Sequence, residues 1–207
     1  MQGQKVLEIG CGRGDFAIWL ATRFPKARVT AIDVSNAAIE IANSRATDAA
    51  VSVGFAVESA ESLSFRDRSF DYVISCECME HVAQPFKMAG EICRVLRPGG
   101  RFILTTENYF NGIILAWLQT WILGKPFDSG SGIQPRENFF VFWKVRSILQ
   151  KRGLEVESME SNHFQWLLLP RTDPAKLCTK DFASPFLKRL FRPFGRHFTF
   201  CGSRPLS

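Results

Sequence analysis

The sequence lacks several features that would place it in a particular class of protein. It has no CxxC pair, no internal repeat and no low-complexity segment, and it contains only two tyrosines and three histidines. Six cysteines without a CxxC pattern are expected to be free, reduced thiols, and no metal site is predicted. No apolar run is long enough to cross a bilayer, and no signal peptide precedes the first predicted strand. We therefore expect a cytoplasmic protein.

The chain is rich in apolar and aromatic residues, and its excess positive charge is concentrated at one end. The 207 residues are 46% hydrophobic, with 19 phenylalanines and five tryptophans, which is enough to bury one substantial core. Residues 1–169 carry 18 basic and 18 acidic side chains, whereas residues 170–207 carry eight basic and two acidic ones. Such a tail is either a solvated edge or a surface for an anionic partner such as a membrane, a nucleic acid or an acidic substrate.

The first half of the chain alternates strand and helix patterns, which predicts a parallel sheet with helices on both faces. Ser35 is a suitable N-cap for the second helix, and Pro98-Gly99-Gly100 ends the third. The predicted strands are Lys5–Ile9, Arg28–Asp33, Val51–Val57, Phe70–Cys76 and Arg101–Thr106. The predicted helices are Asp15–Arg23, a segment from Ser35 to about Thr47, and Pro85–Leu96.

The pattern changes after residue 106, although one domain over residues 1–207 remains the expectation. Residues 107–137 read as an apolar, lid-like insertion with a helical stripe that includes Trp117 and Trp121. A further helix is predicted over Asn138–Arg152, and strands over Leu154–Glu160 and His197–Ser203. Between these strands, residues 161–195 read as a basic, irregular excursion.

A glycine turn follows the first strand in the stretch LEIGCGRGDF. Gly10, Gly12 and Gly14 allow the backbone to approach a ligand and leave helix N–H groups available. A dinucleotide site favours G-x-G-x-x-G, but here the third glycine comes one residue early and Asp15 would repel a pyrophosphate. Asp33 ends the second strand, where its carboxylate can bind both ribose hydroxyls of an adenosine. These residues indicate an adenosine cofactor and leave NAD open.

Four motifs, which follow one another in order along the chain, narrow the choice between adenosine cofactors. The series LEIGCGRGDFA, AIDVS, ESAESLSFRDRSFDYVISCECMEHV and RVLRPGGRFILTT resembles the class I S-adenosylmethionine-dependent methyltransferases, especially the small-molecule group that includes the ubiquinone-pathway methyltransferases. The resemblance implies a Rossmann-like three-layer α/β sandwich with a seven-stranded, mostly parallel sheet of order 3-2-1-4-5-7-6 and an antiparallel seventh strand. It also implies S-adenosyl-L-methionine as cofactor, S-adenosyl-L-homocysteine as product, and O-methylation of a small, apolar acceptor. The apolar stripe of 107–137 and the basic tail suit peripheral contact with an anionic membrane, and no nucleic acid is expected as partner.

The same resemblance assigns cofactor contacts residue by residue. The turn and Glu8 would border the methionine portion, Asp33 the ribose and Val34 the adenine, while Cys76 and Glu77 would lie beside the reactive methyl group. Relatives carry a carboxylate after the third strand to meet the adenine amino group, but this chain has Ser59 there, followed by Ala60 with its backbone N–H. The predicted cofactor residues are Glu8, Gly10, Cys11, Gly12, Gly14, Asp33, Val34, Ser59, Ala60, Cys76 and Glu77.

Catalysis is less well defined by the sequence. His81 is a candidate general base for a hydroxyl acceptor, and the alternative is that it braces the loop after the fourth strand. Relatives carry helices before the first strand that help cover the cofactor, where this sequence has only four residues. We expect a truncated or misstarted form, and the alternative is that the cover comes from elsewhere. The alternatives to a methyltransferase are a non-catalytic S-adenosylmethionine-binding module and an NAD-dependent oxidoreductase. A nucleic-acid methyltransferase is disfavoured because CECME, and no NPPY-like tetrad, follows the fourth strand.

Overall fold

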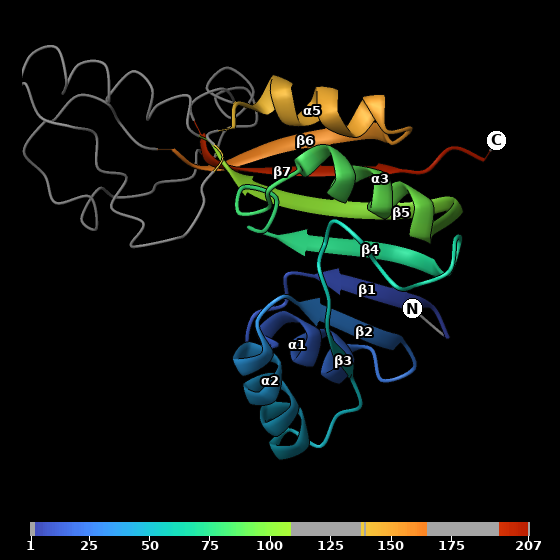
Figure 1. Cartoon of the computed structure of the whole chain (residues 1–207), viewed down its shortest axis with the longest axis vertical. Coiled ribbons are helices and arrows are strands. Elements are labelled where there is room, and N and C mark those ends of the chain that lie inside the picture. The colour runs from blue at the N-terminus through green and yellow to red at the C-terminus, as the bar shows by residue number, and fades with distance from the viewer. Residues whose placement is uncertain (1–2, 109–137, 139, 165–194, 207) are drawn as a thin grey trace, which may run out of the picture.

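The computed structural model of the protein describes residues 3–108, 138, 140–164 and 195–206. Strands and helices alternate along this part of the chain (Figure 1). The strands are β1 (Lys5–Ile9), β2 (Arg28–Asp33), β3 (Gly54–Val57), β4 (Phe70–Cys76), β5 (Leu96–Glu107), β6 (Glu155–Phe164) and β7 (Gly195–Ser203). The helices are α1 (Asp15–Arg23), α2 (Asn36–Asp48), α3 (Pro85–Val95) and α5 (Phe142–Lys151).

The strands form one sheet with the order β3-β2-β1-β4-β5-β7-β6, as predicted. The pairs among β1 to β5 are parallel, whereas β7 is antiparallel to both β5 and β6. The arrowheads of β1, β2 and β4 in Figure 1 point the same way. The first residues of β7 therefore lie at the edge where the parallel strands end, because Glu107 pairs with His197 there.

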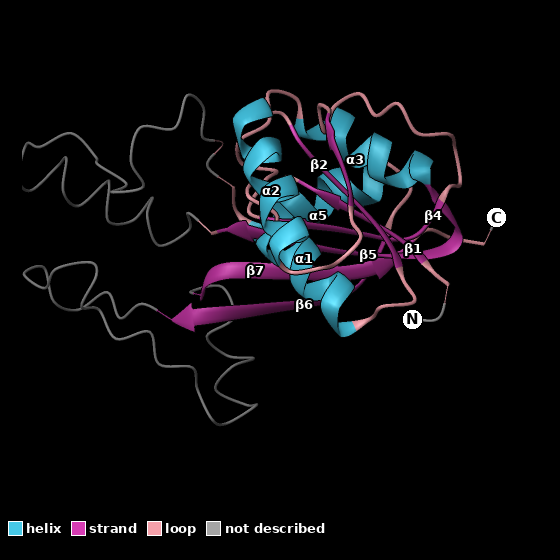
Figure 2. Ribbon diagram, turned by 90° about the horizontal axis from the view of Figure 1, so that it is seen from below, coloured by secondary structure: helices cyan, strands magenta, loops and turns pink. Residues whose placement is uncertain are grey.

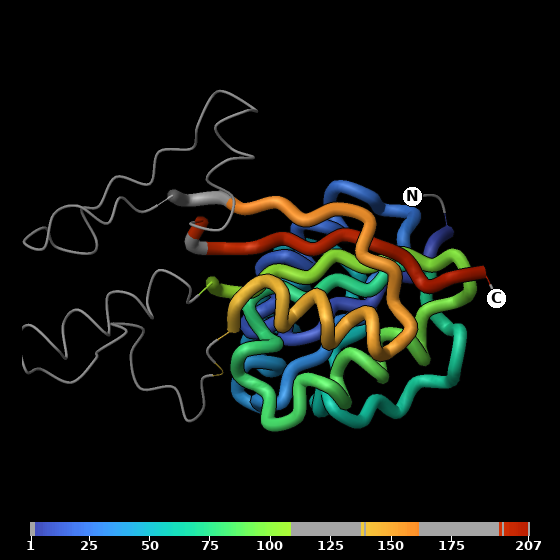
Figure 3. Tube along the Cα trace, turned by 90° about the horizontal axis from the view of Figure 1, so that it is seen from above, coloured from blue at the N-terminus to red at the C-terminus, as the bar shows by residue number. Residues whose placement is uncertain are grey.

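Helices cover the two faces of the sheet and form separate apolar clusters. Alternate residues of a strand face opposite sides, so Leu7 and Ile9 contribute to one cluster and Val6 to the other. The first cluster contains the buried residues of α3 and α5, and the second contains those of α1 together with Ile39 of α2. Figure 2 shows the helices against the sheet, and Figure 3 shows β6 and β7 running side by side next to α5. This is the predicted three-layer arrangement.

Local sequence signals set several element boundaries. The Ser35 hydroxyl accepts a hydrogen bond from the Ala38 N–H at 3.3 Å and caps α2, as predicted. Pro85 occupies the first turn of α3, where the missing N–H costs nothing. Gly153 follows α5 with a φ of 84°, the left-handed conformation that glycine adopts without strain.

Other boundaries differ from the sequence prediction, and each difference has a visible cause. The third strand begins at Gly54 because the Val51 N–H instead bonds to the Ala46 carbonyl at the end of α2. The helix predicted from Asn138 begins at Phe142, because the Asn138 backbone N–H donates to the Glu80 carbonyl outside any helix.

The two strands that flank the excursion, β6 and β7, are both longer than predicted. Pairing of Phe164 with Gly195 extends β6 and β7, so residues 161–164 and 195 belong to strands rather than to an irregular segment. The fifth strand likewise begins at Leu96, directly after α3, instead of at residue 101. The lid-like insertion over 109–137 and the excursion over 165–194 lie outside the described residues. Within the described part of the chain, no helix combines the length and apolarity needed to span a membrane.

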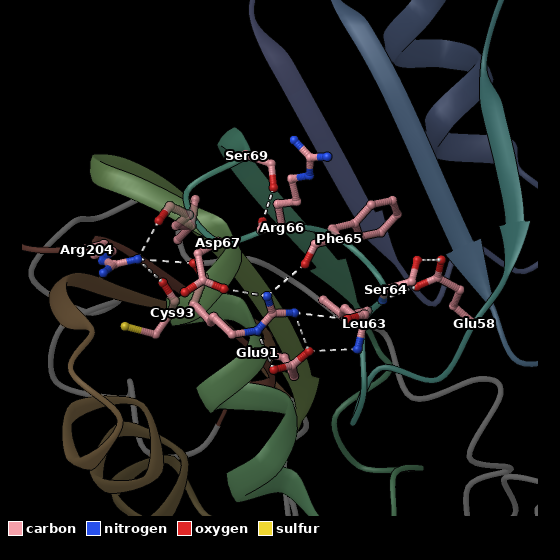
Figure 4. Close-up of polar contacts among 12 residues, drawn as sticks. Glu58, Leu63, Ser64, Phe65, Arg66, Asp67, Ser69, Glu91, Cys93 and Arg204 are labelled. Carbon is pink, nitrogen blue, oxygen red and sulfur yellow. Dashed lines mark hydrogen bonds and ion pairs between the residues drawn. The ribbon is translucent and has the colours of Figure 1, made fainter.

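Arg204 joins the end of the sheet to the end of α3. Its Nη1 donates to the carbonyl oxygens of Cys93, Arg94 and Leu96 at 2.8, 3.2 and 2.8 Å (Figure 4). These carbonyls are at the C-terminal end of the helix, where the helix dipole favours a positive charge. One side chain thereby satisfies several helix-end acceptors and fixes the chain just after β7.

Gly202 offers a direct test of how closely β7 packs between its neighbours. A Cβ atom at this position would lie 1.8 Å from the Glu155 carbonyl oxygen and 2.7 Å from the Phe102 ring. Gly202→Ala should therefore lower the free energy of unfolding by about 3 kcal/mol or more, measured by urea denaturation. Gly54→Ala is the control, because the nearest atom to its Cβ lies 3.8 Å away. Equal stabilities of the two variants would show that β7 does not pack as described.

Candidate functional site

The glycine turn connects β1 to α1, and its three glycines have different roles. Gly10, Gly12 and Gly14 have φ values of 76°, 50° and 79°, which side-chain-bearing residues rarely adopt. A Cβ on Gly10 would lie 2.6 Å from the Cys78 sulfur, and one on Gly14 would lie 2.9 Å from the Ala42 Cβ. A Cβ on Gly12 would meet nothing within 4 Å. Gly10 and Gly14 are therefore required for packing as well as for backbone conformation.

Asp33 holds this turn from the end of β2. One carboxylate oxygen accepts the Gly12 N–H at 2.8 Å, and the other accepts the Ser35 N–H at 2.9 Å. The N–H groups of Gly10 and Cys11 both donate to the Ile32 carbonyl at 2.9 Å. Each carboxylate oxygen can accept a second hydrogen bond, so Asp33 retains acceptor capacity for a ligand's hydroxyl groups.

A cleft of about 190 Å³ opens beside Asp33. It brings together six of the residues predicted from the sequence, namely Gly10, Asp33, Val34, Ser59, Ala60 and His81. The sequence analysis did not single out its other lining residues, Ile32, Glu58, Glu61, Cys78, Val82 and Ala83. The predicted residues outside this lining are Glu8, Cys11, Gly12, Gly14, Cys76 and Glu77.

The loop after β3 forms one wall of the cleft and is tied to the start of α3. The Ser59 hydroxyl accepts the Glu61 N–H at 3.2 Å. A carboxylate oxygen of Glu61 accepts the N–H groups of Ala83 and Gln84 at 2.6 and 3.1 Å. Because the Gln84 side chain makes no capping hydrogen bond, Glu61 supplies an acceptor to the helix terminus from a distant part of the chain.

Arg94 of α3 anchors the continuation of the same loop. Its guanidinium donates to both carboxylate oxygens of Glu91 at 2.8 Å and to one of Asp67 at 2.7 Å. It also donates to the carbonyls of Phe65 and Leu63, at 2.7 and 3.0 Å (Figure 4). Hydrogen bonding to Glu91 and Asp67 raises the pKa of Arg94 and lowers that of Glu91. No local sequence pattern predicts this clamp, since its members lie on separate segments.

Glu8, on the strand that precedes the turn, is an unusually buried carboxyl group. Its side chain is 3% exposed, and its Oε2 has no hydrogen-bond partner among the described residues. Burial, helped by the nearby charges of Asp15 and Asp33, raises the pKa of Glu8 from 4.5 to about 7. An orphaned buried oxygen beside a positive-φ glycine turn fits a ligand that brings its own donor, such as the ammonium group of a methionine moiety.

A second polar group gathers where β4, β5 and β7 meet. Glu77 follows β4 with a φ of 47°, and its N–H donates to the carbonyl and hydroxyl oxygens of Thr105 at 3.1 and 3.2 Å. The Nδ1 of His197 lies 3.3 Å from Glu77 Oε2, an ion-pair distance. Ligand atoms of Glu77, Glu107 and His197 all lie within 4.8 Å of one another.

Glu80 is buried next to this group and differs from Glu77 in ionisation. The Thr106 hydroxyl donates to Glu80 Oε2 at 3.1 Å. Burial, together with the charge of Glu77, raises the pKa of Glu80 to about 8. Burial also opposes ionisation of Glu77, but hydrogen bonds from His197, Thr105 and Glu80 outweigh it and lower the pKa of Glu77. At neutral pH, Glu80 therefore keeps its proton while Glu77 is a carboxylate.

These features define a class I methyltransferase fold: the 3-2-1-4-5-7-6 sheet, the glycine turn after β1 and the acid at the end of β2. Residues 6–100 match a family model described as a methyltransferase domain. Over these residues the chain is similar to a methyltransferase domain, in agreement with the resemblance to class I S-adenosylmethionine-dependent methyltransferases found in the sequence.

Individual relatives match the same region. A ubiquinone biosynthesis O-methyltransferase from Alkalilimnicola ehrlichii is 36% identical over 109 residues, which are 52% of this chain and 43% of that protein. A fatty-acid O-methyltransferase from Mycolicibacterium smegmatis is 37% identical over 106 residues, 51% of this chain and 38% of that protein. The chain thus spans less than half the length of these curated relatives.

Among solved structures, an S-adenosylmethionine-dependent methyltransferase from Methanosarcina mazei superposes with a TM-score of 0.71. The alignment covers 100% of this chain and 95% of that chain at 21% sequence identity. At this identity the likeness establishes the fold alone.

The state of Glu8 predicts a pH dependence of stability. Between pH 4.5 and 7 the folded protein holds a proton that the unfolded chain has released, so raising the pH through this window should reduce stability. Glu8 should contribute a loss of about 3 kcal/mol over the window, in addition to the loss from the raised pKa of Glu80. Glu8→Gln should reduce the total loss by this amount, as measured by urea denaturation at several pH values. Exposed Glu155→Gln should keep the wild-type slope. An unchanged slope in Glu8→Gln would show that the buried carboxyl is already ionised.

Proposed function

We propose that the protein transfers the methyl group of S-adenosyl-L-methionine to an oxygen atom of a small-molecule acceptor and releases S-adenosyl-L-homocysteine. The observation that carries this proposal is the glycine turn that Asp33 holds open beside the cleft. The orphaned carboxyl oxygen of Glu8 under the same turn supports it further. The cofactor brings an already activated methyl on a sulfonium, so the protein's main task is to align the acceptor oxygen with it.

The proposed roles follow the position of each residue. Asp33 binds the ribose hydroxyls, and Glu8 with the turn backbone faces the methionine portion. Val34, which is 76% exposed, and the loop at Ser59 and Ala60 bound the adenine. Cys76 and Glu77 lie at the end of β4, the strand next to β1, and border the methyl group. The full set is Glu8, Gly10, Cys11, Gly12, Gly14, Asp33, Val34, Ser59, Ala60, Cys76 and Glu77, with His81 in the cleft as a candidate base.

The acceptor is proposed to be largely apolar, with its reactive group at the polar strand ends. The names of the relatives, which act on a ubiquinone precursor and on fatty acids, support an apolar acceptor. The apolar stripe that includes Trp117 and Trp121 in the lid-like segment 107–137 supports it from the sequence. The basic residues of 170–207 would suit peripheral contact of a cytoplasmic enzyme with an anionic membrane surface.

Binding of the cofactor can be tested at Asp33. Asp33→Ala removes the carboxylate and its bonds to the turn, so the affinity for S-adenosylhomocysteine should fall about thirtyfold or more, corresponding to ~2 kcal/mol. Isothermal titration calorimetry on the purified chain measures this, with exposed Asp48→Ala as the matched control. NAD should give no saturable heat. Tighter binding of NAD than of S-adenosylhomocysteine would instead favour an oxidoreductase.

Turnover separates an enzyme from a binding module. Incorporation of radiolabelled methyl from S-adenosylmethionine is expected with apolar phenols or alcohols in a screen of lipid, quinone-like and polyketide-like acceptors. Trp117→Ser/Trp121→Ser should raise the acceptor's KM while the thermal midpoint changes little. Cofactor binding without methyl transfer to any acceptor would support the non-catalytic alternative, and unfolding of the double variant would assign the stripe to the core.

A further inference from the structure

His197 is not among the residues assigned to the cofactor, but it pairs with Glu77, which is assigned to the border of the methyl group. His197 is the third residue of β7, and its backbone pairs with Glu107 at the end of β5. The Asn108 amide donates to the Gly195 carbonyl at 2.7 Å and so fixes the start of β7. The imidazole is consequently held at the carboxyl ends of the parallel strands, where ligands bind in open α/β sheets.

The pair lies next to the expected reaction centre. Glu77 stands between Cys76, the last residue of β4, and Cys78, which lines the cleft and abuts Gly10. β4 is the neighbour of β1, so Glu77 is one strand away from the glycine turn, and His197 reaches Glu77 from β7. His81, the base predicted from the sequence, instead lines the cleft with Ala60 and Val82, on the side assigned to the adenine.

The geometry points to His197, aligned by Glu77, as the general base that takes the proton from a neutral hydroxyl acceptor; this inference rests on the proposed function. His197 Nδ1 lies 3.3 Å from Glu77 Oε2. A carboxylate at this distance favours the tautomer with its proton on Nδ1, which leaves the basic lone pair on Nε2. The acceptor oxygen forms its bond to the methyl carbon as the carbon–sulfur bond breaks, with that electron pair remaining on sulfur. The hydroxyl proton goes to Nε2 of His197 and then to solvent. Glu77 takes no proton in this step and acts through His197 as a positioning residue.

The surrounding charge selects the class of acceptor. Among the described residues, the carboxylates grouped with His197 are Glu77, which follows β4, and Glu107 of β5. Glu80 lies beside Glu77. Glu77 is ionised at neutral pH, so an acceptor that arrived as a carboxylate would meet repulsion at the strand ends. A phenol or alcohol arrives uncharged and also requires a base. The site therefore favours hydroxyl over carboxylate methylation.

The variants His197→Gln and Glu77→Gln test both parts of this inference. At neutral pH, His197→Gln should lower kcat for a phenol at least a hundredfold, because general bases contribute about 10²–10⁴ in rate, while the Kd for S-adenosylhomocysteine stays near the wild-type value. The acid limb of the pH–rate profile should disappear, and imidazole should restore activity to His197→Ala. Glu77→Gln should produce a smaller loss, and Glu155→Gln should produce none.

A spectroscopic measurement checks the pair without relying on turnover. Imidazole ¹⁵N NMR should show His197 as the Nδ1–H tautomer in the wild type, and this signature should change in Glu77→Gln. Three results would overturn the inference. The first is full kcat in His197→Gln, and the second is a rate loss and a lost acid limb in His81→Gln instead. The third is a requirement for added Mg²⁺ or Mn²⁺ that vanishes in both variants. A total absence of methyl transfer by the wild type would overturn the proposed function itself, whereas the outcomes above leave that function intact.

Discussion

The hydrogen bond from the Gly12 N–H to the Asp33 carboxylate is the constraint on which the candidate site depends. It joins the turn after β1 to the end of β2, and the paired bonds of Gly10 and Cys11 to the Ile32 carbonyl reinforce it. The turn must adopt left-handed backbone conformations to make these contacts, which only glycine does without strain. Binding at this place is thus built into the connection between two central strands rather than into a separate loop.

The second wall of the cleft is held from the other side of the sheet. Glu61 ties the loop after β3 to the start of α3, and Arg94 ties the continuation of that loop to the helix body. Arg204 then fixes the end of α3 to the chain after β7. α3 therefore connects the cleft to the chain after β7 through charged hydrogen bonds, each of which is stronger than a neutral one.

The carboxyl groups of the site are kept in different protonation states by their surroundings. Glu8 and Glu80 are buried and have raised pKa values, whereas Glu77 receives hydrogen bonds that favour its charged form. For the proposed reaction of a cationic sulfonium with an uncharged acceptor, one fixed negative charge near the reacting atoms and neutral carboxyl groups elsewhere would be favourable. Like charges at all three positions would raise the free energy of the folded state.

The sequence by itself determined the order of strands and helices, the positions of β1, β2, β4 and α1, and the turn with its acid partner Asp33. These features follow from local hydrophobic periodicity, from caps such as Ser35, and from short motifs whose residue spacing is set by a single turn between two elements. The Glu77–His197 pair, the Arg94 clamp and the Glu61 bridge were decided only by the tertiary structure. Their members are separated by as many as 120 residues, because antiparallel insertion of β7 beside β5 brings the C-terminal part of the chain to the ends of the central strands. No local pattern encodes such a pairing, since the energy that selects it comes from burial and hydrogen bonding across the whole sheet.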